Sequence, residues 1–193
     1  MKRIQKVLLP VLMAFLVLTC TGCGETGTPP LLTVGGVEIT LGESTMGALE
    51  KEGFEMSVPG GGLLIGKMEA RSYLTSLISA KKDNETHAYL YIYNPTLEEK
   101  FYGSCVIYQL KFTMNSEEKS YWAKDNVLVN GINFFGMDSA AVKEAMSAYK
   151  LARETDNGSL RYEDGDFKYY FYFDEATKVV SEVTVEMDIP NGY

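Results

Sequence analysis

Apolar and polar residues alternate along several short segments, and this period of two restricts the chain to a fold rich in β-strands. In residues 182–188, Val183, Val185 and Met187 alternate with hydroxyl and acidic side chains. The same period over residues 105–114 predicts a strand with an apolar face made of Val106, Tyr108, Leu110, Phe112 and Met114. Because successive side chains of a strand point to opposite faces, each segment predicts a sheet with one buried face.

Two segments have helical spacing instead. A short helix is expected after the hydroxyl pair at residues 44–45, and Gly53 is expected to end it. A longer helix, with Asp138 or Ser139 as its N-cap, is expected over about residues 139–153, where apolar side chains recur every three to four positions.

Together these elements predict an α+β fold, in which antiparallel sheets are packed by one longer and one short helix. A strand, a glycine, a capping residue and a helix follow one another twice, around Gly42 and Gly136, so an arrangement of two related subdomains is left open. The first half is expected over residues 31–115. The second half is expected over residues 116–193, as a helix followed by a β-meander. Residues 69–82 fit a helix or a strand, and a strand is favoured.

The N-terminus has the pattern of an export signal. Lys2, Arg3 and Lys6 precede residues 7–18, which carry no charge. Twelve residues are too few to cross a hydrocarbon core, which needs roughly 20. They fit the apolar region of a signal peptide, which has about 7–15 residues.

The segment at residues 18–24, LTCTGCG, resembles a bacterial lipobox. The resemblance implies diacylglycerol on a cysteine sulfur and cleavage before that cysteine. Cys23 has a glycine on both sides and is the predicted lipidation site, with Cys20 as the alternative. We therefore expect a signal peptide at residues 1–22, then the lipidated cysteine and a short stalk at residues 23–30.

Charge excludes one class of partner. The net charge of the chain is −8, and removal of the signal peptide takes away three basic residues and no acidic one. A mature chain this acidic is not expected to bind nucleic acid, because that affinity comes largely from lysine and arginine on phosphates. Cys105 would be the only thiol left, so no internal disulfide is expected.

Three familiar catalytic or nucleotide-binding patterns are incomplete. Residues 61–67 resemble a phosphate-binding loop, but Met68 stands where a hydroxyl should reach Mg²⁺, so no nucleotide is expected. His87 is the only histidine, and Cys105 falls on a predicted strand as a packed thiol. A histidine-based triad and a zinc site of the usual type therefore lack residues.

Carboxylates gather near the second predicted hairpin, at Glu163, Asp164, Asp166 and Asp174. Asp164 and Asp166 flank a glycine, which favours a turn with surface charge around it. A cation site and a catalytic carboxylate pair are the alternatives, and each needs more convergent oxygens than the spacing guarantees. No metal and no cofactor are predicted.

Tyrosines give the sequence its candidate binding face. The chain has 13 of them, and Tyr89, Tyr91 and Tyr93 share one side of a predicted strand. Tyr170 and Tyr172 share another, opposite a side rich in phenylalanine. Rigid aromatic rings with a polar tip are good contacts for a protein or a glycan. The alternative is that these tyrosines are ordinary half-buried residues of a sheet.

Two resemblances to known families extend this prediction. The stretches GGVEITLGEST, LEKEGFE and YNPT, then Gly103-Ser104-Cys105-Val106, follow the lipobox in this order. Over residues 1–115 this order resembles uncharacterised lipoproteins of clostridial-type Gram-positive bacteria, which implies a lipoprotein without a known activity.

The second resemblance concerns the C-terminal part of the chain. Gly136-Met137-Asp138-Ser139, then Tyr162, an aromatic strand and a closing Val/Glu strand, resemble the layout of SmpA/OmlA-type lipoproteins. The β-lactamase inhibitor protein has a similar helix-on-sheet plan. The Gly-x-Pro that usually follows the helix is absent, and residues 147–149 stand there. The resemblance implies a fold only.

We therefore predict a membrane-tethered lipoprotein that faces outside the cytoplasm and binds a protein or a glycan without being an enzyme. A structural or assembly lipoprotein of the cell envelope is the alternative. An envelope hydrolase comes third and would need Glu163 or Asp166 beside another acid in a cleft.

Overall fold

The computed structural model describes residues 27–58, 60, 62–83, 85–114 and 127–189. The signal peptide, Cys20 and Cys23 lie outside the described residues. Antiparallel strands dominate the described part, which has two α-helices, α1 (Met46–Lys51) and α3 (Ser139–Ala145). The predicted antiparallel sheets are present. The fold is nevertheless mainly β rather than α+β, because the helices are too short to form a layer of their own.

One large sheet has nine strands in the order β11-β12-β13-β14-β9-β7-β6-β3-β4, and every neighbouring pair is antiparallel. In chain order these strands are β3 (Glu55–Val58), β4 (Gly62–Leu63), β6 (Ile78–Lys82), β7 (Glu85–Tyr93), β9 (Val106–Thr113), β11 (Lys150–Glu154), β12 (Leu160–Asp164), β13 (Phe167–Phe173) and β14 (Val180–Met187). The large sheet therefore has its centre at β14 and β9.

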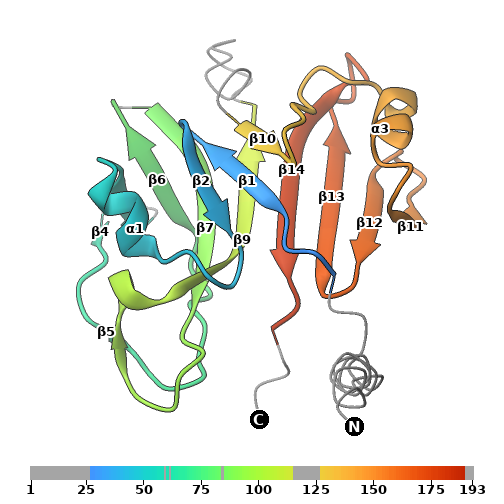
Figure 1. Cartoon of the computed structure of the whole chain (residues 1–193). Helices are drawn as coiled ribbons and strands as arrows, with labels where there is room; N and C mark the ends of the chain where they lie inside the picture. Colours follow the sequence, from blue (N-terminus) through green and yellow to red (C-terminus); the bar gives the residue numbers. More distant parts are fainter. Residues whose placement is uncertain (1–26, 59, 61, 84, 115–126, 190–193) are drawn as a thin grey trace, which may run out of the picture.

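Two smaller sheets complete the fold. One contains β1 (Leu31–Val34), β2 (Val37–Thr40) and β10 (Val127–Val129) in the order β10-β1-β2. The other pairs β5 (Lys67–Met68) with β8 (Lys100–Phe101), and a 3₁₀ turn, η1 (Tyr102–Ser104), follows β8. The three-stranded sheet lies in front of the centre of the large sheet, and α1 and α3 lie to either side of it (Figure 1).

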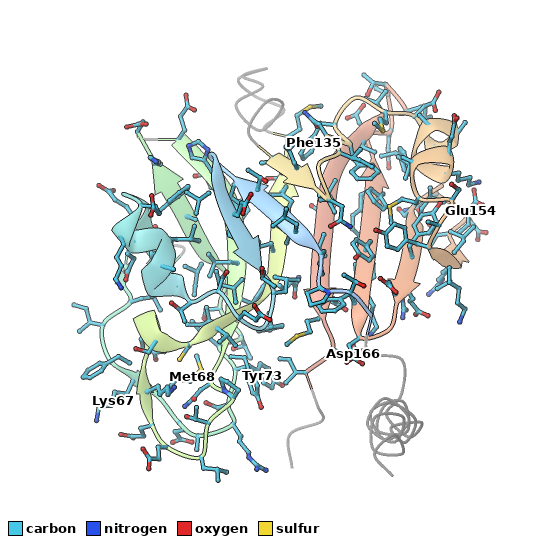
Figure 2. All side chains as sticks on the ribbon, in the orientation of Figure 1. Lys67, Met68, Tyr73, Phe135, Glu154 and Asp166 are labelled. Atoms are coloured by element: carbon cyan, nitrogen blue, oxygen red, sulfur yellow. The ribbon has the colours of Figure 1, made fainter. Side chains whose placement is uncertain are left out.

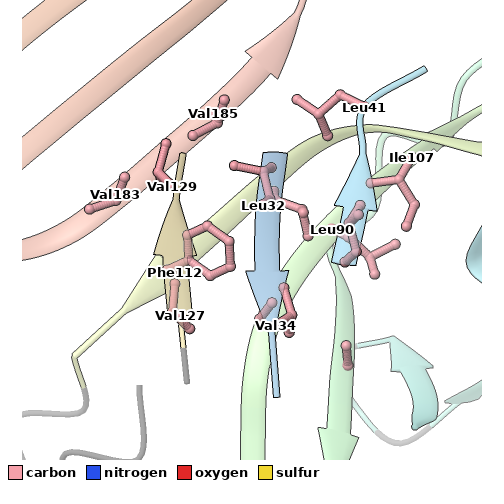
Figure 3. Close-up of a cluster of buried hydrophobic side chains, with 14 of the residues drawn as sticks. Leu32, Val34, Leu41, Leu90, Ile107, Phe112, Val127, Val129, Val183 and Val185 are labelled. Carbon is pink, nitrogen blue, oxygen red and sulfur yellow. The ribbon is translucent and has the colours of Figure 1, made fainter. Parts of the chain in front are cut away.

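The core fills the space between the three-stranded sheet and the large sheet. Leu32 and Val34 of β1 are fully buried, as are Phe112 of β9 and Val185 of β14 (Figure 3). Each apolar side chain removed from water in this way stabilises the fold by about 1.5–3 kcal/mol. The opposite side of the large sheet, which we call the open face, carries the alternate residues of the same strands.

The chain contains two series of elements in a similar order. If the short β4, β5, η1 and β8 are left aside, the first series is β1, β2, α1, β3, β6, β7 and β9. The second is β10, α3, β11, β12, β13 and β14, which has one strand fewer before its helix among the described residues. The last strands of the two series, β9 and β14, pair at the centre of the large sheet, and the first strands, β1 and β10, also pair. In each series the residue before the helix bridges to the start of the last strand: Thr45 to Val106, and Asp138 to Val179.

The predicted helix over about 139–153 is wrong beyond its first two turns. Asp138 is the N-cap, and its carboxylate accepts a hydrogen bond of 2.8 Å from the Ala141 amide. The helix ends at Ala145, with Met146 as its C-cap, and residues 150–154 form the edge strand β11. Pairing with β12 supplies that segment with backbone hydrogen bonds, so tertiary contacts override a helical spacing that is only a weak local preference.

The predicted apolar face of β9 is wrong at its first residues. Tyr91 pairs with Gln109 but Ile92 pairs with Ile107, so Tyr108 is the extra residue of a β-bulge. A bulge shifts the alternation by one position. Ile107 is therefore buried with Leu110 and Phe112, while Tyr108 joins the open face.

Residues 69–82, which the sequence left undecided, are a strand only at their end, in β6. The preceding residues follow an irregular path against the end of β7, where Tyr73 bridges to Tyr93. The Leu74 amide also donates to the Ile92 carbonyl at 3.0 Å. This irregular segment therefore packs along the outside of β7.

Candidate binding face

The tyrosines of β7 and β13 alternate with core residues. Tyr89 and Tyr91 flank Leu90, which is fully buried, and Tyr170 and Tyr172 flank Phe171, also fully buried. The first three tyrosines are half-buried, and Tyr172 is 40% exposed. The open face therefore carries four of the five tyrosines that the sequence singled out.

Strand register brings these tyrosines into common rows. One row of direct cross-strand partners runs Arg161, Tyr170, Thr184, Lys111, Tyr89. The next row runs Glu163, Lys168, Glu186, Gln109, Tyr91. Neighbouring strands lie about 4.8 Å apart, so the tyrosines of β13 and β7 are separated by about 14 Å across β14 and β9.

Tyr93 does not belong to the exposed part of this face. Its side chain is 8% exposed, because the irregular segment before β6 covers the end of β7. The Asn94 amide, for example, donates to the Ser72 carbonyl at 2.9 Å. Tyr73 lies on the covering segment and is 57% exposed, so it presents an aromatic ring where the sequence predicted Tyr93.

Three tyrosines form a cluster at the β7 side of the open face. The ring of Tyr108 lies 6.1 Å from that of Tyr91 and 6.5 Å from that of Tyr73, in tilted and edge-to-face arrangements. Burial, followed by the neighbouring Tyr91, Tyr73 and Glu186, raises the pKa of Tyr108 to about 12. Such aromatic pairs add about 0.5–1.5 kcal/mol beyond their buried area.

Sequence reasoning missed two members of this cluster. Tyr108 was assigned to the core because a bulge leaves no mark on a period-two pattern. Tyr73 was not assigned, because its segment forms no regular element. The only signal for Tyr108 in the sequence is that a tyrosine stands among the apolar residues of the period-two pattern, and this signal is weak.

Paired charges fix the side chains at the β13 side of the face. The Tyr170 hydroxyl donates to Glu186 Oε1 at 2.7 Å, and Lys111 Nζ lies 2.6 Å from Glu182 Oε2. Burial, and then the bond to Glu186, raises the pKa of Tyr170. The Arg161 guanidinium lies over the Tyr170 ring, 5.7 Å from its centroid. These contacts fix the orientation of the side chains at this side of the open face.

The acidic residues that the sequence singled out do not come together in one cleft. Glu163 pairs with Arg161, and Asp174 accepts hydrogen bonds from the Thr177 amide and hydroxyl, which lower its pKa. Asp164 and Asp166 flank Gly165, whose φ of +56° fits the predicted hairpin turn. Within the described ranges, no three His, Cys, Asp or Glu side chains are grouped to hold a metal ion.

Cys105 and His87 are both buried. Burial raises the pKa of the Cys105 thiol, which lies 3.5 Å from the Phe101 carbonyl oxygen. The His87 ring packs edge-on against Phe54, with 5.6 Å between ring centroids. The glycine-rich stretch that resembles a phosphate-binding loop contributes Gly62 to β4, which pairs with β3.

Among the residues that the structure describes, no helix has the length and apolarity needed to cross a bilayer. Comparisons of the chain with protein-family models, with curated proteins and with solved structures give no match. The resemblances to lipoprotein families therefore stay predictions.

Proposed function

We propose that this protein is a lipoprotein, anchored through Cys23 outside the cytoplasm, that binds another protein on the open face of its large sheet. The single observation that carries the proposal is the placement of six tyrosines on or beside that face: Tyr73, Tyr89, Tyr91, Tyr108, Tyr170 and Tyr172. Tyrosine is enriched at the centre of protein interfaces, because it buries a large rigid ring and keeps a polar tip.

The spread of these tyrosines favours a protein over a glycan. They form two groups about 14 Å apart on strands β7 and β13. Between them lie the Lys111–Glu182 ion pair and Glu186, which accepts a hydrogen bond from Tyr170. A standard protein interface buries about 800 Å² on each partner, so two tyrosine groups at this separation can both lie within one such interface. The strands form one hydrogen-bonded sheet, so little ordering is needed on binding.

We also propose that the two halves of the chain are related subdomains. The repeated element order and the matched bridges before α1 and α3 support this reading. Each half contributes one tyrosine group to the open face, β7 and β9 from the first and β13 from the second. A partner that spans the face would therefore touch both halves.

Capture of envelope proteins on the immobilised chain tests the binding proposal. The test variant carries serine at Tyr89, Tyr91, Tyr170 and Tyr172. The control carries serine at Ile65 and Leu97, which are 82% and 74% exposed and belong to the loops of the first half. We expect one specific partner that the control retains and the tyrosine variant loses.

Thermal unfolding of both variants keeps this result interpretable. The tyrosine variant must still melt cooperatively, since half-buried rings also contribute packing. Retention of the same partner by a folded tyrosine variant would contradict the proposal, as would the absence of any specific partner for the unmodified chain.

Metabolic labelling with a fatty acid tests the anchor separately. Cys23→Ser should abolish labelling and membrane fractionation, whereas Cys20→Ser should leave both intact. The opposite pattern would move the anchor to Cys20, and labelling that survives both changes would refute the lipoprotein reading.

A further inference from the structure

Two arginines face each other across the edge of the large sheet. Arg153 of β11 is the direct cross-strand partner of Arg161 of β12, because a β-bulge before Arg153 shifts the register. Like charges directly opposite each other on neighbouring strands destabilise a sheet. The chain has a net charge of −8, so acidic residues outnumber basic ones and two arginines placed opposite each other call for an explanation.

The two arginines line a cavity of about 160 Å³ at the β11 end of the open face. The other residues around it are Thr155, Ser159, Leu160, Tyr170 and Tyr172. No carboxylate is part of this lining. Cavities that hold whole small molecules usually measure about 300–1,000 Å³, so this one is of the size for a single terminal group.

The nearby acids pair with lysines or with Arg161, and not with Arg153. Glu154 follows Arg153 on β11, and its side chain points to the other side of the sheet. There its carboxylate pairs with Lys143 of α3 at 2.8 Å. Figure 2 labels Glu154 at this edge of the sheet. Glu163 lies 2.5 Å from Arg161 Nη2 and also 3.7 Å from Lys150 Nζ. One carboxylate thus serves two cations, and Arg153 makes no ion pair within the described residues.

The Arg161 guanidinium keeps an unused donor. Its Nε is buried and has no hydrogen-bond partner among the described residues. A buried donor without an acceptor costs about 1–3 kcal/mol, so such groups are rare unless an acceptor arrives from outside. The Tyr170 ring under Arg161 holds the guanidinium in place.

We propose that this cavity binds an oxyanion that the protein partner presents, namely the carboxylate of an acidic side chain. Guanidinium groups hold carboxylates and phosphates through parallel N–H···O bonds, and two arginines line this cavity, of which Arg153 makes no ion pair within the described residues. Tyr172 also lines the cavity, and its side chain carries a hydroxyl donor. The identity of the partner's group rests on the proposed function, whereas anion binding by the cavity does not.

NMR titration of the full chain with acetate and with inorganic phosphate, at constant ionic strength set by chloride, tests the cavity. We expect the Nε–H signals of Arg153 and Arg161 to shift saturably. Arg153→Gln should weaken the affinity about tenfold, since a charged hydrogen bond contributes about 1.5–3 kcal/mol. A larger response to acetate identifies a carboxylate site, and a larger response to phosphate identifies a site for a phosphorylated group.

Lys150→Gln is the matched control, because this lysine lies on the same strand with a 77% exposed side chain and does not line the cavity. Its affinity should stay within about twofold of the unmodified chain. Shifts that never saturate, or an equal loss in the two variants, would overturn the anion site.

The capture experiment with Arg153→Gln separates this inference from the proposed function. Loss of the captured partner together with loss of anion binding supports both. If anion binding fails while the tyrosine variant still loses its partner, only the inference is wrong. If the cavity binds acetate but capture of the partner does not depend on the tyrosines, the proposed function is wrong. Anion binding by the cavity then stands, but the assignment of the anion to a protein partner does not.

Discussion

The two halves of the chain build the same sheet with different connections. In the second half, short turns join β12 to β13 and β13 to β14. In the first half, residues 59–77 separate β3 from β6, and residues 94–105 separate β7 from β9. These longer connections form the lobe that carries Lys67 and Met68, at the lower left of Figure 2.

This difference shows how one plan can give two kinds of surface. The longer connections of the first half cover Tyr93 and bring Tyr73 beside Tyr108, so that end of the open face is aromatic. The turns of the second half are short, and Tyr172 and Arg153 are exposed at that end of the open face. The strands of the sheet set the positions of the side chains on the open face, and the connections between strands determine which of these side chains are exposed.

The largest effect is expected from a substitution in the core that the two halves share. Phe112 of β9 is fully buried and pairs with Val183 of β14, so the two halves share it. Phe112→Ala should reduce the free energy of unfolding by about 3–5 kcal/mol. Urea unfolding followed by circular dichroism and by hydrogen exchange in each half should give one common transition. Two separate transitions would mean that the halves are stable independently.

The next largest effect is expected in the turn between β1 and β2, where two neighbouring glycines differ in their surroundings. Gly35 has a φ of +54°, and a Cβ there would lie 2.9 Å from Phe54 Cζ. Gly35→Ala should therefore cost more than the conformational penalty of about 1–2 kcal/mol. Gly36 has a φ of +82° with open space around it, so Gly36→Ala should cost only that penalty. Urea midpoints of the two variants measure the difference, and equal midpoints would contradict it.

A smaller effect compares the two helix caps. Asp138 accepts a hydrogen bond from the Ala141 amide, whereas the Thr45 side chain makes no such bond to α1. Asp138→Ala should destabilise the protein by about 1 kcal/mol, the usual value for a lost N-cap. Thr45→Ala should cost less than about 0.5 kcal/mol. Thermal melting of both variants measures the two losses of stability. A larger loss in Thr45→Ala than in Asp138→Ala would contradict the prediction.

The last comparison separates the two tyrosine groups by their titration at alkaline pH. The folded chain holds the Tyr108 proton more tightly than the unfolded chain, where tyrosine ionises near about pH 10. Stability should therefore be constant below about pH 10 and should fall as the pH rises toward about 12. Phenolate absorbance should lose its step near pH 12 in Tyr108→Phe and keep it in Tyr170→Phe. A step that survives in Tyr108→Phe would assign it to another residue.

Sequence patterns predicted those elements whose signal is local. The strands at residues 31–34 and 37–40, the Asp138 cap and the buried parity of Phe167 and Phe171 all agree with the structure. Each depends on residues that are neighbours along the chain.

The features that could not be predicted depend on distant partners. Lys150 to Glu154 become a strand only because β12 lies beside them. Tyr108 turns outward because its register against β7 slips by one residue. The cavity requires Arg153 and Tyr172 from strands that are not adjacent, and no pattern of spacing encodes that meeting.

The pairing of β1 with β10 has a consequence for how the chain folds. The Leu31 amide donates to Asn130 Oδ1 at 2.8 Å, across a sequence separation of 99 residues. While the chain is synthesised from its N-terminus, β1 and β9 each have an unpaired edge until β10 and β14 have been made. Folds dominated by such long-range contacts form slowly and are prone to aggregation in the interval. The second half of the chain therefore protects the first half from aggregation, because β10 pairs with the open edge of β1 and β14 pairs with the open edge of β9.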